Sequence, residues 1–160
     1  MIAALRFLHL LAIVSWVGSI LFFSFVGAPT LFAALPREMA GRAVSAIFPR
    51  YYLLGLISGA VAIASALILG AIAGRRDRAF AATIALLAVM LGLTLYADRV
   101  VRPRAAILRQ ALPGLEGTPE HAVARARFDA LHRRSVLLNG AVLLLGLGVI
   151  ATIAGRGGRP

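Results

Sequence analysis

Four apolar stretches, each long enough to cross a lipid bilayer, dominate this chain. They run approximately over Leu5–Val26, Tyr51–Ala73, Phe80–Tyr96 and Ser135–Ala154. A helix needs about 20 residues, each rising about 1.5 Å, to cross the hydrocarbon layer of a membrane. The stretches contain no Lys, Asp or Glu, and their only Arg is Arg6. The sequence therefore predicts an all-α integral membrane protein built as a four-helix bundle.

We expect one transmembrane domain over residues 1–160. The chain is 61% hydrophobic, whereas soluble domains are usually about 45–50% apolar. With their flanking residues, the spans are predicted at about 5–28, 51–73, 79–97 and 133–154. The chain left between them is too short for a soluble catalytic domain, so the composition disfavours an enzyme and predicts no catalytic residue.

The charge of the chain points to lipid as a partner. There are 17 basic residues, all of them Arg, against 6 acidic ones, which gives a formal charge of +11. In a soluble protein this balance would suggest nucleic acid. Here the Arg residues gather at the ends of the apolar stretches, where guanidinium groups anchor helices and meet lipid phosphates. We therefore expect membrane lipid and no nucleic acid as a partner, and leave a homo-oligomer open.

The composition also suggests a source and a location. The chain is rich in Ala and has no Lys, which is typical of a GC-rich bacterial genome. We accordingly expect a multi-pass protein of a bacterial inner membrane. The chain has no Cys and only three Met, so the sequence predicts no thiolate metal site and few soft ligands for copper.

The connection between the third and fourth spans is predicted to be mostly helical. Arg99–Ala111 and Glu120–Arg134 continue the two spans, and the Pro and Gly in Leu112–Gly117 mark the turn between them. The fourth helix would then have about 37 residues and a length of about 55 Å, which exceeds the bilayer. The third and fourth helices should therefore extend beyond the membrane as an antiparallel hairpin.

Two proline residues set the expected ends of the first and second helices. The first helix is predicted to end at Ala28, because Pro29 follows it, and Thr30–Ser45 is expected to be a connection. Pro49 suits the first turn of the second helix. That helix carries small residues in steps of three and four on one face, which favours close approach of a neighbouring helix. These residues are Gly55, Gly59, Ala62, Ala66, Gly70 and Gly74.

Polar residues near the bilayer face suggest a ligand site. Ser135 and Asn139 follow His132 at helical spacing, and the turn near Leu115 puts Asp98 level with His132. Ionisable groups at membrane depth need partners, so we expect the Asp98 carboxylate within about 4 Å of the imidazole, or joined to it through one water. The predicted ligand-binding residues are Asp98, His132, Ser135, Asn139, Tyr51 and Tyr52. The alternative is that these groups only hold helices together.

His9 is the second histidine predicted to lie at membrane depth. It cannot share one haem with His132, because the two should lie about 25–30 Å apart across the bilayer. Ligation of a haem b by His9 alone stays open. We expect no cofactor and no metal site, because no cluster of metal-ligating residues is visible, with haem b on His9 as the alternative.

Several motifs resemble the transmembrane protein 205-like family of small four-helix membrane proteins. They are Leu5–Leu11, Trp16–Gly18, Phe25–Phe32, Leu35–Arg37, Ile47–Tyr52, Asp98 and Phe128–Ser135 with Asn139. The resemblance implies four transmembrane helices and a domain of largely unknown biochemistry. A more distant similarity joins copper resistance D-type proteins and a bacterial four-helix protoporphyrinogen oxidase, through Arg6-Phe7-Leu8-His9 at the start of the first helix.

Two functions follow from these observations. The first is a non-enzymatic membrane protein that binds or transports a small ligand through a polar face inside the bundle. The alternative is a haem-binding redox protein with His9 as axial ligand.

Overall fold

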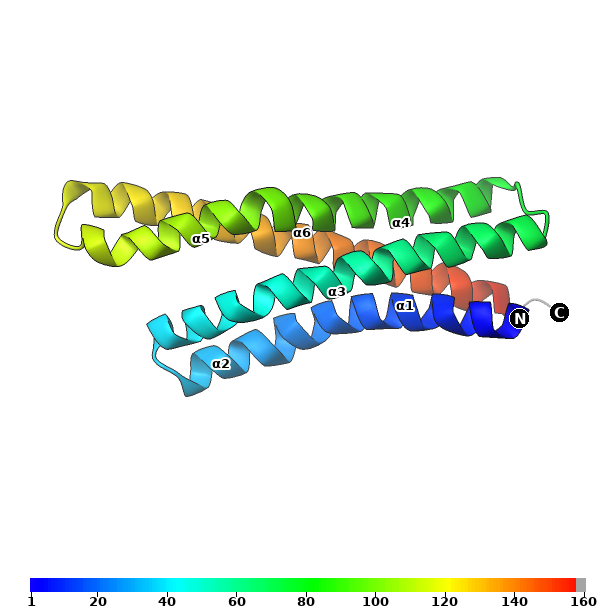
Figure 1. Ribbon diagram of the computed structural model, residues 1–160, viewed down its shortest axis with the longest axis horizontal. Helices are drawn as coiled ribbons and strands as arrows, with labels where there is room; N and C mark the ends of the chain where they lie inside the picture. The colour runs from blue at the N-terminus through cyan, green and yellow to red at the C-terminus, as the bar shows by residue number, and fades with distance from the viewer. Residues whose placement is uncertain (158–160) are drawn as a thin grey trace.

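The computed structural model describes residues 1–157, with the side chains of residues 1–155. Within this range the chain folds into four long helical rods joined by short turns, without a strand (Figure 1). Each rod is long and apolar enough to cross a membrane. The all-α four-helix fold that the sequence predicts is therefore confirmed.

The first rod consists of α1 (Ile2–Phe22), the π-helical segment η1 (Phe23–Gly27) and α2 (Ala28–Ala34). The second rod is α3 (Arg37–Ile72). The third contains α4 (Arg78–Tyr96), the π-helical segment η2 (Ala97–Val101), α5 (Arg102–Ala111) and the short 3₁₀ turn η3 (Leu112–Leu115). The fourth is α6 (Pro119–Gly157).

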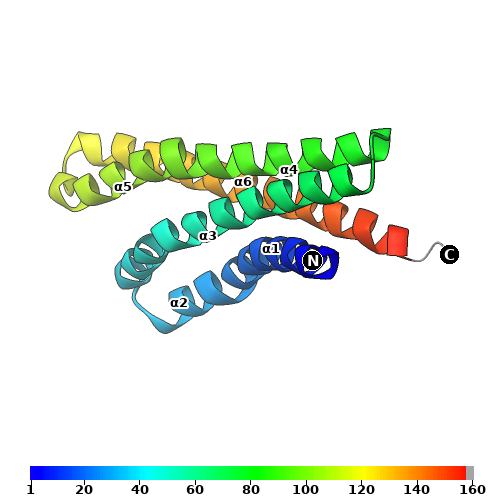
Figure 2. The same cartoon turned by 45° about the vertical axis from the view of Figure 1, so that its right-hand side comes forward.

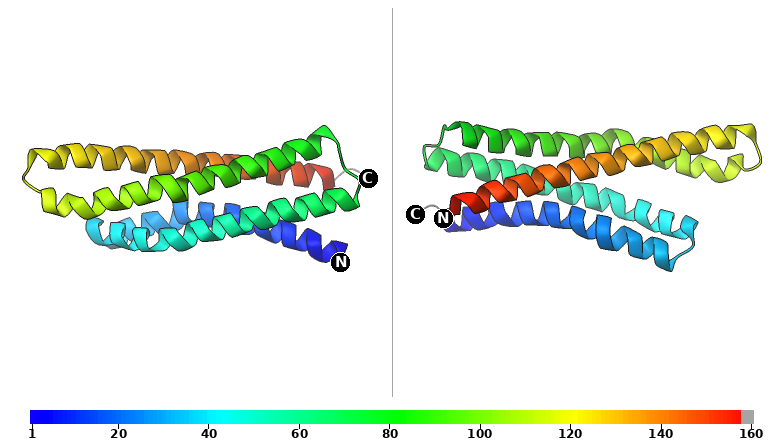
Figure 3. Two further views of the ribbon diagram at one scale, coloured as in Figure 1. Left: turned by 45° about the horizontal axis from the view of Figure 1, so that its top comes forward. Right: turned by 180° about the vertical axis from the view of Figure 1, so that it is seen from behind.

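The rods form a ring in which α1 and α4 each contact both α3 and α6. Figure 2 shows α3 between α1 and α4, and the view from behind in Figure 3 shows α6 crossing the opposite side. Helices α3 and α6 are therefore diagonal partners across the centre. The start of α1 and the end of α6 lie at one end of the bundle, and α5 and the start of α6 extend beyond the α2–α3 turn at the other (Figure 1). This extension is the antiparallel hairpin that the sequence predicts.

The centre of the bundle is packed around one large aromatic side chain on α1. Trp16 is only 1% exposed, and its indole lies against Gly55 and Gly59 of α3. The small residues of α3 are buried, as the sequence predicts, with the exception of Gly74 in the α3–α4 turn. Gly74 has a φ of +62°, a left-handed conformation that glycine adopts without strain.

The expected end of the first helix at Ala28 is wrong. The rod continues through Pro29 to Ala34, because a π-helical turn precedes the proline. The Ala28 N–H donates to the Phe23 carbonyl five residues back, which widens the turn where the proline ring would otherwise clash. A second π-helical turn precedes Pro103, where the Arg102 N–H donates to the Ala97 carbonyl five residues back.

The expected start of the second helix at Pro49 is also wrong. Helix α3 begins at Arg37, Pro49 lies inside it, and the connection consists only of Leu35 and Pro36. A proline inside a helix removes one backbone hydrogen bond, and membrane helices tolerate this where neighbouring groups satisfy the freed carbonyl. The segment that the sequence assigned to a loop is thus two helical ends that pack against each other.

Candidate functional site

Four polar side chains meet at the centre of the bundle, and we call them the polar centre: Tyr51 and Tyr52 of α3, with Ser135 and Asn139 of α6. The Tyr51 hydroxyl donates to Asn139 Oδ1 over 3.4 Å. The Tyr52 hydroxyl and Ser135 Oγ lie 3.3 Å apart. Since α3 and α6 are diagonal, these hydrogen bonds cross the middle of the bundle. The structure therefore brings together four of the six residues predicted to bind a ligand.

Asp98 lies in η2 and is 8% exposed, so its carboxylate is buried. Arg102 Nε donates to Asp98 Oδ1 over 2.8 Å, and Arg99 Nε lies 3.2 Å from Oδ2. The π-helical turn gives Asp98 and the start of α5 a different rotation from that of a continuous α-helix. A charged group is thereby held inside the bundle with its own cationic partners, as buried charges require.

The direct pairing of Asp98 with His132 is wrong. His132 is exposed and lies 6.4 Å from the Phe128 ring, nearly parallel to it. Within the described part of the chain no hydrogen bond or ion pair joins it to Asp98. The predicted register between the third and fourth rods is nevertheless correct. Arg134, two residues after His132, lies 5.5 Å over the ring of Tyr96, two residues before Asp98.

The error in the predicted pairing is one of rotation about α6. The buried face of this helix passes through Val142, Gly146 and Val149. At about 100° per residue, His132 is turned about 75° away from the middle of that face. Ser135 and Asn139 lie closer to it. His132 consequently faces the outside of the bundle, while the other two residues point inward.

Aromatic rings surround the polar centre toward the extended hairpin. The Tyr51 ring lies 5.2 Å from Phe23 of η1 and 5.2 Å from Tyr52. Phe48 of α3 lies 5.8 Å from Tyr52 and 5.5 Å from Phe23. The π-helical segment η1 therefore brings an aromatic side chain, Phe23, onto the candidate site, which the sequence pattern did not indicate.

Arg109 of α5 joins three elements near the extended end of the bundle. Its guanidinium donates to the Gly41 carbonyl and to Ser45 Oγ of α3. It also lies 5.3 Å over the Phe128 ring of α6. Sequence reasoning missed this residue, since nothing in the local pattern distinguishes one Arg from its neighbours. Its contacts close the space between the α2–α3 hairpin and the α5–α6 hairpin.

A cavity of about 10 Å³ adjoins the polar centre. Its lining includes Trp16, Ser19, Tyr51, Thr94 and Asn139. A space of this size holds about one water molecule, whereas small-molecule sites usually measure about 300–1,000 Å³. A ligand larger than water therefore requires the helices around the polar centre to separate.

His9 forms a second polar contact, between α1 and α3. Its Nδ1 lies 3.0 Å from the Ala62 carbonyl and 3.0 Å from Ser65 Oγ. A carbonyl only accepts hydrogen bonds, so this contact requires a proton on Nδ1, and in the neutral ring Nε2 then keeps its lone pair. Ala62 lies 11 residues from Tyr51, or about 16 Å along α3, so His9 is separate from the polar centre. The described residues contain no group of three or more metal-ligating side chains.

Comparison with known proteins places the chain in a family. The family model described as "Domain of unknown function (DUF4149)" matches residues 11–112. The chain belongs to this DUF4149 family. Tyr51, Tyr52 and Asp98 lie inside the matched region, and Ser135 and Asn139 lie after it. The polar centre is therefore assembled from the DUF4149 match and from α6, which follows the match.

A curated relative of this chain has no function in its description. An uncharacterized protein of Aquifex aeolicus (strain VF5) is 56% identical to the DUF4149 protein over 36 residues, which are 22% of this chain and 27% of the relative. The chain thus matches about a quarter of that protein's length. No solved structure matches the chain.

The hydrogen bonds of the polar centre are expected to contribute little to stability. The Tyr52–Ser135 contact is long, at 3.3 Å, and interhelical hydrogen bonds in membrane proteins average about 0.6 kcal/mol. Tyr52→Phe should therefore lower the free energy of unfolding in detergent by about 0.6 kcal/mol. A loss above about 2 kcal/mol, beyond the range measured for such bonds, would indicate that the polar centre mainly holds the bundle together.

Proposed function

We propose that this DUF4149 protein binds or transports a small polar ligand through the polar centre. One observation carries the proposal: four hydrogen-bonding side chains meet between four apolar helices, and a buried carboxylate, Asp98, lies on the side of the extended hairpin. Polar and charged groups at membrane depth are costly, and ionisable ones inside a bundle mark ligand or ion pathways. The weak hydrogen bonds expected between α3 and α6 agree with a site that opens.

The arrangement of the groups supports entry from the end of the bundle where α5 and α6 extend. Asp98, Arg102 and Arg109 lie on that side of the polar centre, together with the rings of Phe23 and Phe48. A ligand that separates the Arg109 guanidinium from the Gly41 carbonyl would then pass the Phe48 ring, which lies 5.8 Å from Tyr52, before it reaches the polar centre. The residues of the polar centre offer hydroxyl and amide groups, which donate to and accept from a small polar molecule.

Two further parts of this proposal concern classification and location. The motifs around Trp16, Ile47–Tyr52 and Asp98 support a closer relation to the transmembrane protein 205-like family. The Arg-rich ends of the apolar helices and the absence of Lys support a bacterial inner membrane.

Native mass spectrometry of the purified full-length protein tests the proposal. Wild type should retain a small non-lipid molecule, and Asn139→Leu should lose it because the amide that faces the polar centre is gone. Ser24→Ala, which removes an exposed hydroxyl from η1, is the matched control and should retain it. Folded wild-type protein without any such molecule, or equal retention by Asn139→Leu, would contradict the proposal.

A haem-binding redox function is the second candidate, and the tautomer of His9 favours it. Haem-ligating histidines commonly bind iron through one ring nitrogen while the other donates to a carbonyl. The contact between His9 Nδ1 and the Ala62 carbonyl leaves Nε2 in that state. A bound haem would supply one-electron chemistry, and His9 would hold its iron.

An absorbance spectrum separates this candidate from the first. If His9 ligates haem, purified wild-type protein shows a Soret band and His9→Ala removes it. The Ser65→Ala variant keeps the Ala62 carbonyl contact and should keep the band, with a shift at most. Wild-type protein without a Soret band, or a His9→Ala variant with an intact one, excludes His9 as the ligand.

A further inference from the structure

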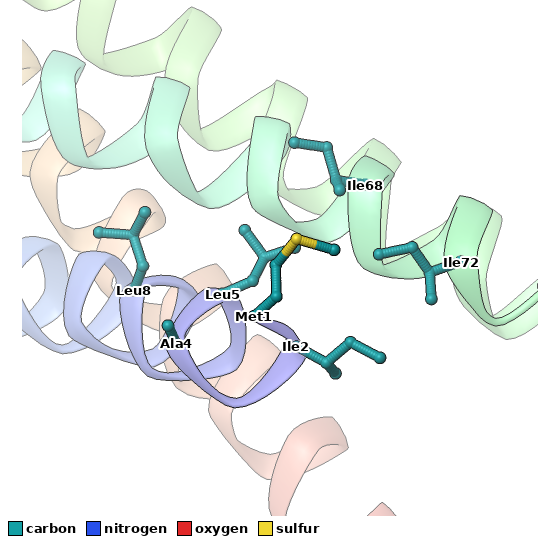
Figure 4. A pocket seen from close by; sticks show the side chains of 7 residues that line it. All are labelled: Met1, Ile2, Ala4, Leu5, Leu8, Ile68 and Ile72. Carbon is teal, nitrogen blue, oxygen red and sulfur yellow. The ribbon is translucent and has the colours of Figure 1, made fainter.

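An apolar groove opens between α1 and α3 at the end of the bundle where α1 begins and α6 ends. It has a volume of about 380 Å³. Met1 and, on α1, Ile2, Ala4, Leu5 and Leu8 line one side, and Ile68 and Ile72 of α3 line the other (Figure 4). The groove is lined by apolar side chains and lies along the last turns of α3, at the depth of the apolar spans. In a membrane, a groove of this chemistry is complementary to a lipid acyl chain.

Unpaired cations lie just beyond this groove. Arg76 follows Ile72 in the exposed turn between α3 and α4, and Arg78 begins α4. Arg6 of α1 is also exposed, but at about 100° per residue it is turned away from the groove-lining face of Leu5 and Leu8. None of the three forms an ion pair with a residue that the structure describes. Side chains of a helix lean toward its N-terminus, so Arg6 leans toward the same end of the bundle. Long Arg side chains at this position reach the headgroup layer.

Arg75 in the same turn, unlike these arginines, has partners within the protein. Its Nε lies 3.3 Å from Asp77 Oδ2, and its guanidinium lies 5.7 Å over the Phe80 ring. The carboxylate of Asp77 also accepts from the Phe80 N–H at the start of α4. The one acidic residue of the turn is thus occupied, which leaves Arg76 and Arg78 to meet an anion from outside.

We propose that this groove and these arginines bind one anionic phospholipid. The acyl chain lies between α1 and α3, and the headgroup phosphate meets Arg76 and Arg78. Charge complementarity selects this occupant, because a second copy of the chain would bring more Arg to a turn that is already positive. The site is at the opposite end of the bundle from the extended hairpin and is independent of the polar centre.

Binding of defined lipids to the full-length protein tests the proposal. The protein is delipidated in neutral detergent, and native mass spectrometry measures the affinity for dioleoyl phosphatidylglycerol and for dioleoyl phosphatidylcholine. The two lipids share their acyl chains, so a difference reports on the headgroup. Phosphatidylglycerol should bind more tightly, and Arg76→Gln should weaken it about fivefold, as expected for one Arg near an anionic headgroup. Arg104→Gln, an exposed arginine at the other end, should leave the affinity unchanged.

A substitution in the groove tests the acyl-chain part. Ile68→Trp places a bulky ring in the groove and should abolish tight binding of phosphatidylglycerol. Leu67→Trp is the matched control, because Leu67 is the adjacent residue, is equally exposed and lies outside the groove. Equal affinity for the two lipids, equal losses in the two tryptophan variants, or a wild-type dimer that Ile68→Trp separates would each overturn the proposal. Loss of the small molecule in Asn139→Leu does not bear on this result.

Discussion

Replacing Gly59 with leucine is expected to destabilise the folded bundle strongly. A Cβ atom at Gly59 would lie 2.7 Å from Trp16 Cη2 and 2.9 Å from Leu91 Cδ1, so the Trp16 ring and the Leu91 side chain would both have to move. Overpacking of this kind typically costs about 1–3 kcal/mol. The measurement is the thermal unfolding temperature of the purified protein in detergent.

Gly92→Leu is the matched control for this substitution. Gly92 also lies inside a membrane helix, but no atom lies within 4 Å of the position that its Cβ would take. The control should unfold close to wild type. If Gly59→Leu unfolds at the wild-type temperature, the small-residue face of α3 does not pack against Trp16, and the arrangement of α1 on α3 is wrong.

Truncating Trp16, which packs against Gly59, should have the largest effect on stability. Trp16 is almost completely buried between α1 and α3, and truncation of a buried aromatic to alanine typically costs about 3–5 kcal/mol through lost contacts and a cavity. Trp16→Ala should accordingly unfold well below wild type. Phe7→Ala provides the control, because Phe7 lies on the same helix with its side chain exposed.

A double variant measures the contact between Trp16 and Gly59 directly. In Trp16→Ala with Gly59→Leu, the leucine side chain can occupy space that the indole has left. The combined loss should then be smaller than the sum of the single losses, by about 0.5–3 kcal/mol as for residues in contact. Strictly additive losses would mean that the two residues do not touch.

The sequence predicts the four rods because their apolar lengths match the bilayer, and this signal does not depend on which side of a helix faces inward. The packing role of the small residues of α3 could also be predicted, since only Gly and Ala allow the indole of Trp16 to approach the backbone. The helix ends that were predicted from proline residues are wrong. Pro29 and Pro49 lie inside rods because a π-helical turn or tertiary packing compensates for the missing hydrogen bond.

The candidate site was predictable only in part. Helices that are apolar on all sides carry no pattern that tells the core-facing side from the lipid-facing side. Tyr52, Ser135 and Asn139 were found because polar groups at this depth are rare. His132 was placed at the correct height but on the wrong side of α6, and a rotation of about 75° about a helix of 3.6 residues per turn is enough to separate it from Asp98.

Water access to the polar centre is the most direct test of the central claim. The chain has no Cys, so Asn139→Cys and Leu137→Cys each introduce a single thiol about 3 Å apart along α6. Asn139 faces the polar centre, whereas the Leu137 side chain is 73% exposed on the outside of the bundle. A membrane-impermeant, water-soluble thiol reagent reacts with the thiolate, which forms only in contact with water. In native membranes Asn139→Cys should react and Leu137→Cys, although nearer the extended end, should not. An unreactive Asn139→Cys in folded protein would contradict the proposal that a polar ligand reaches this site.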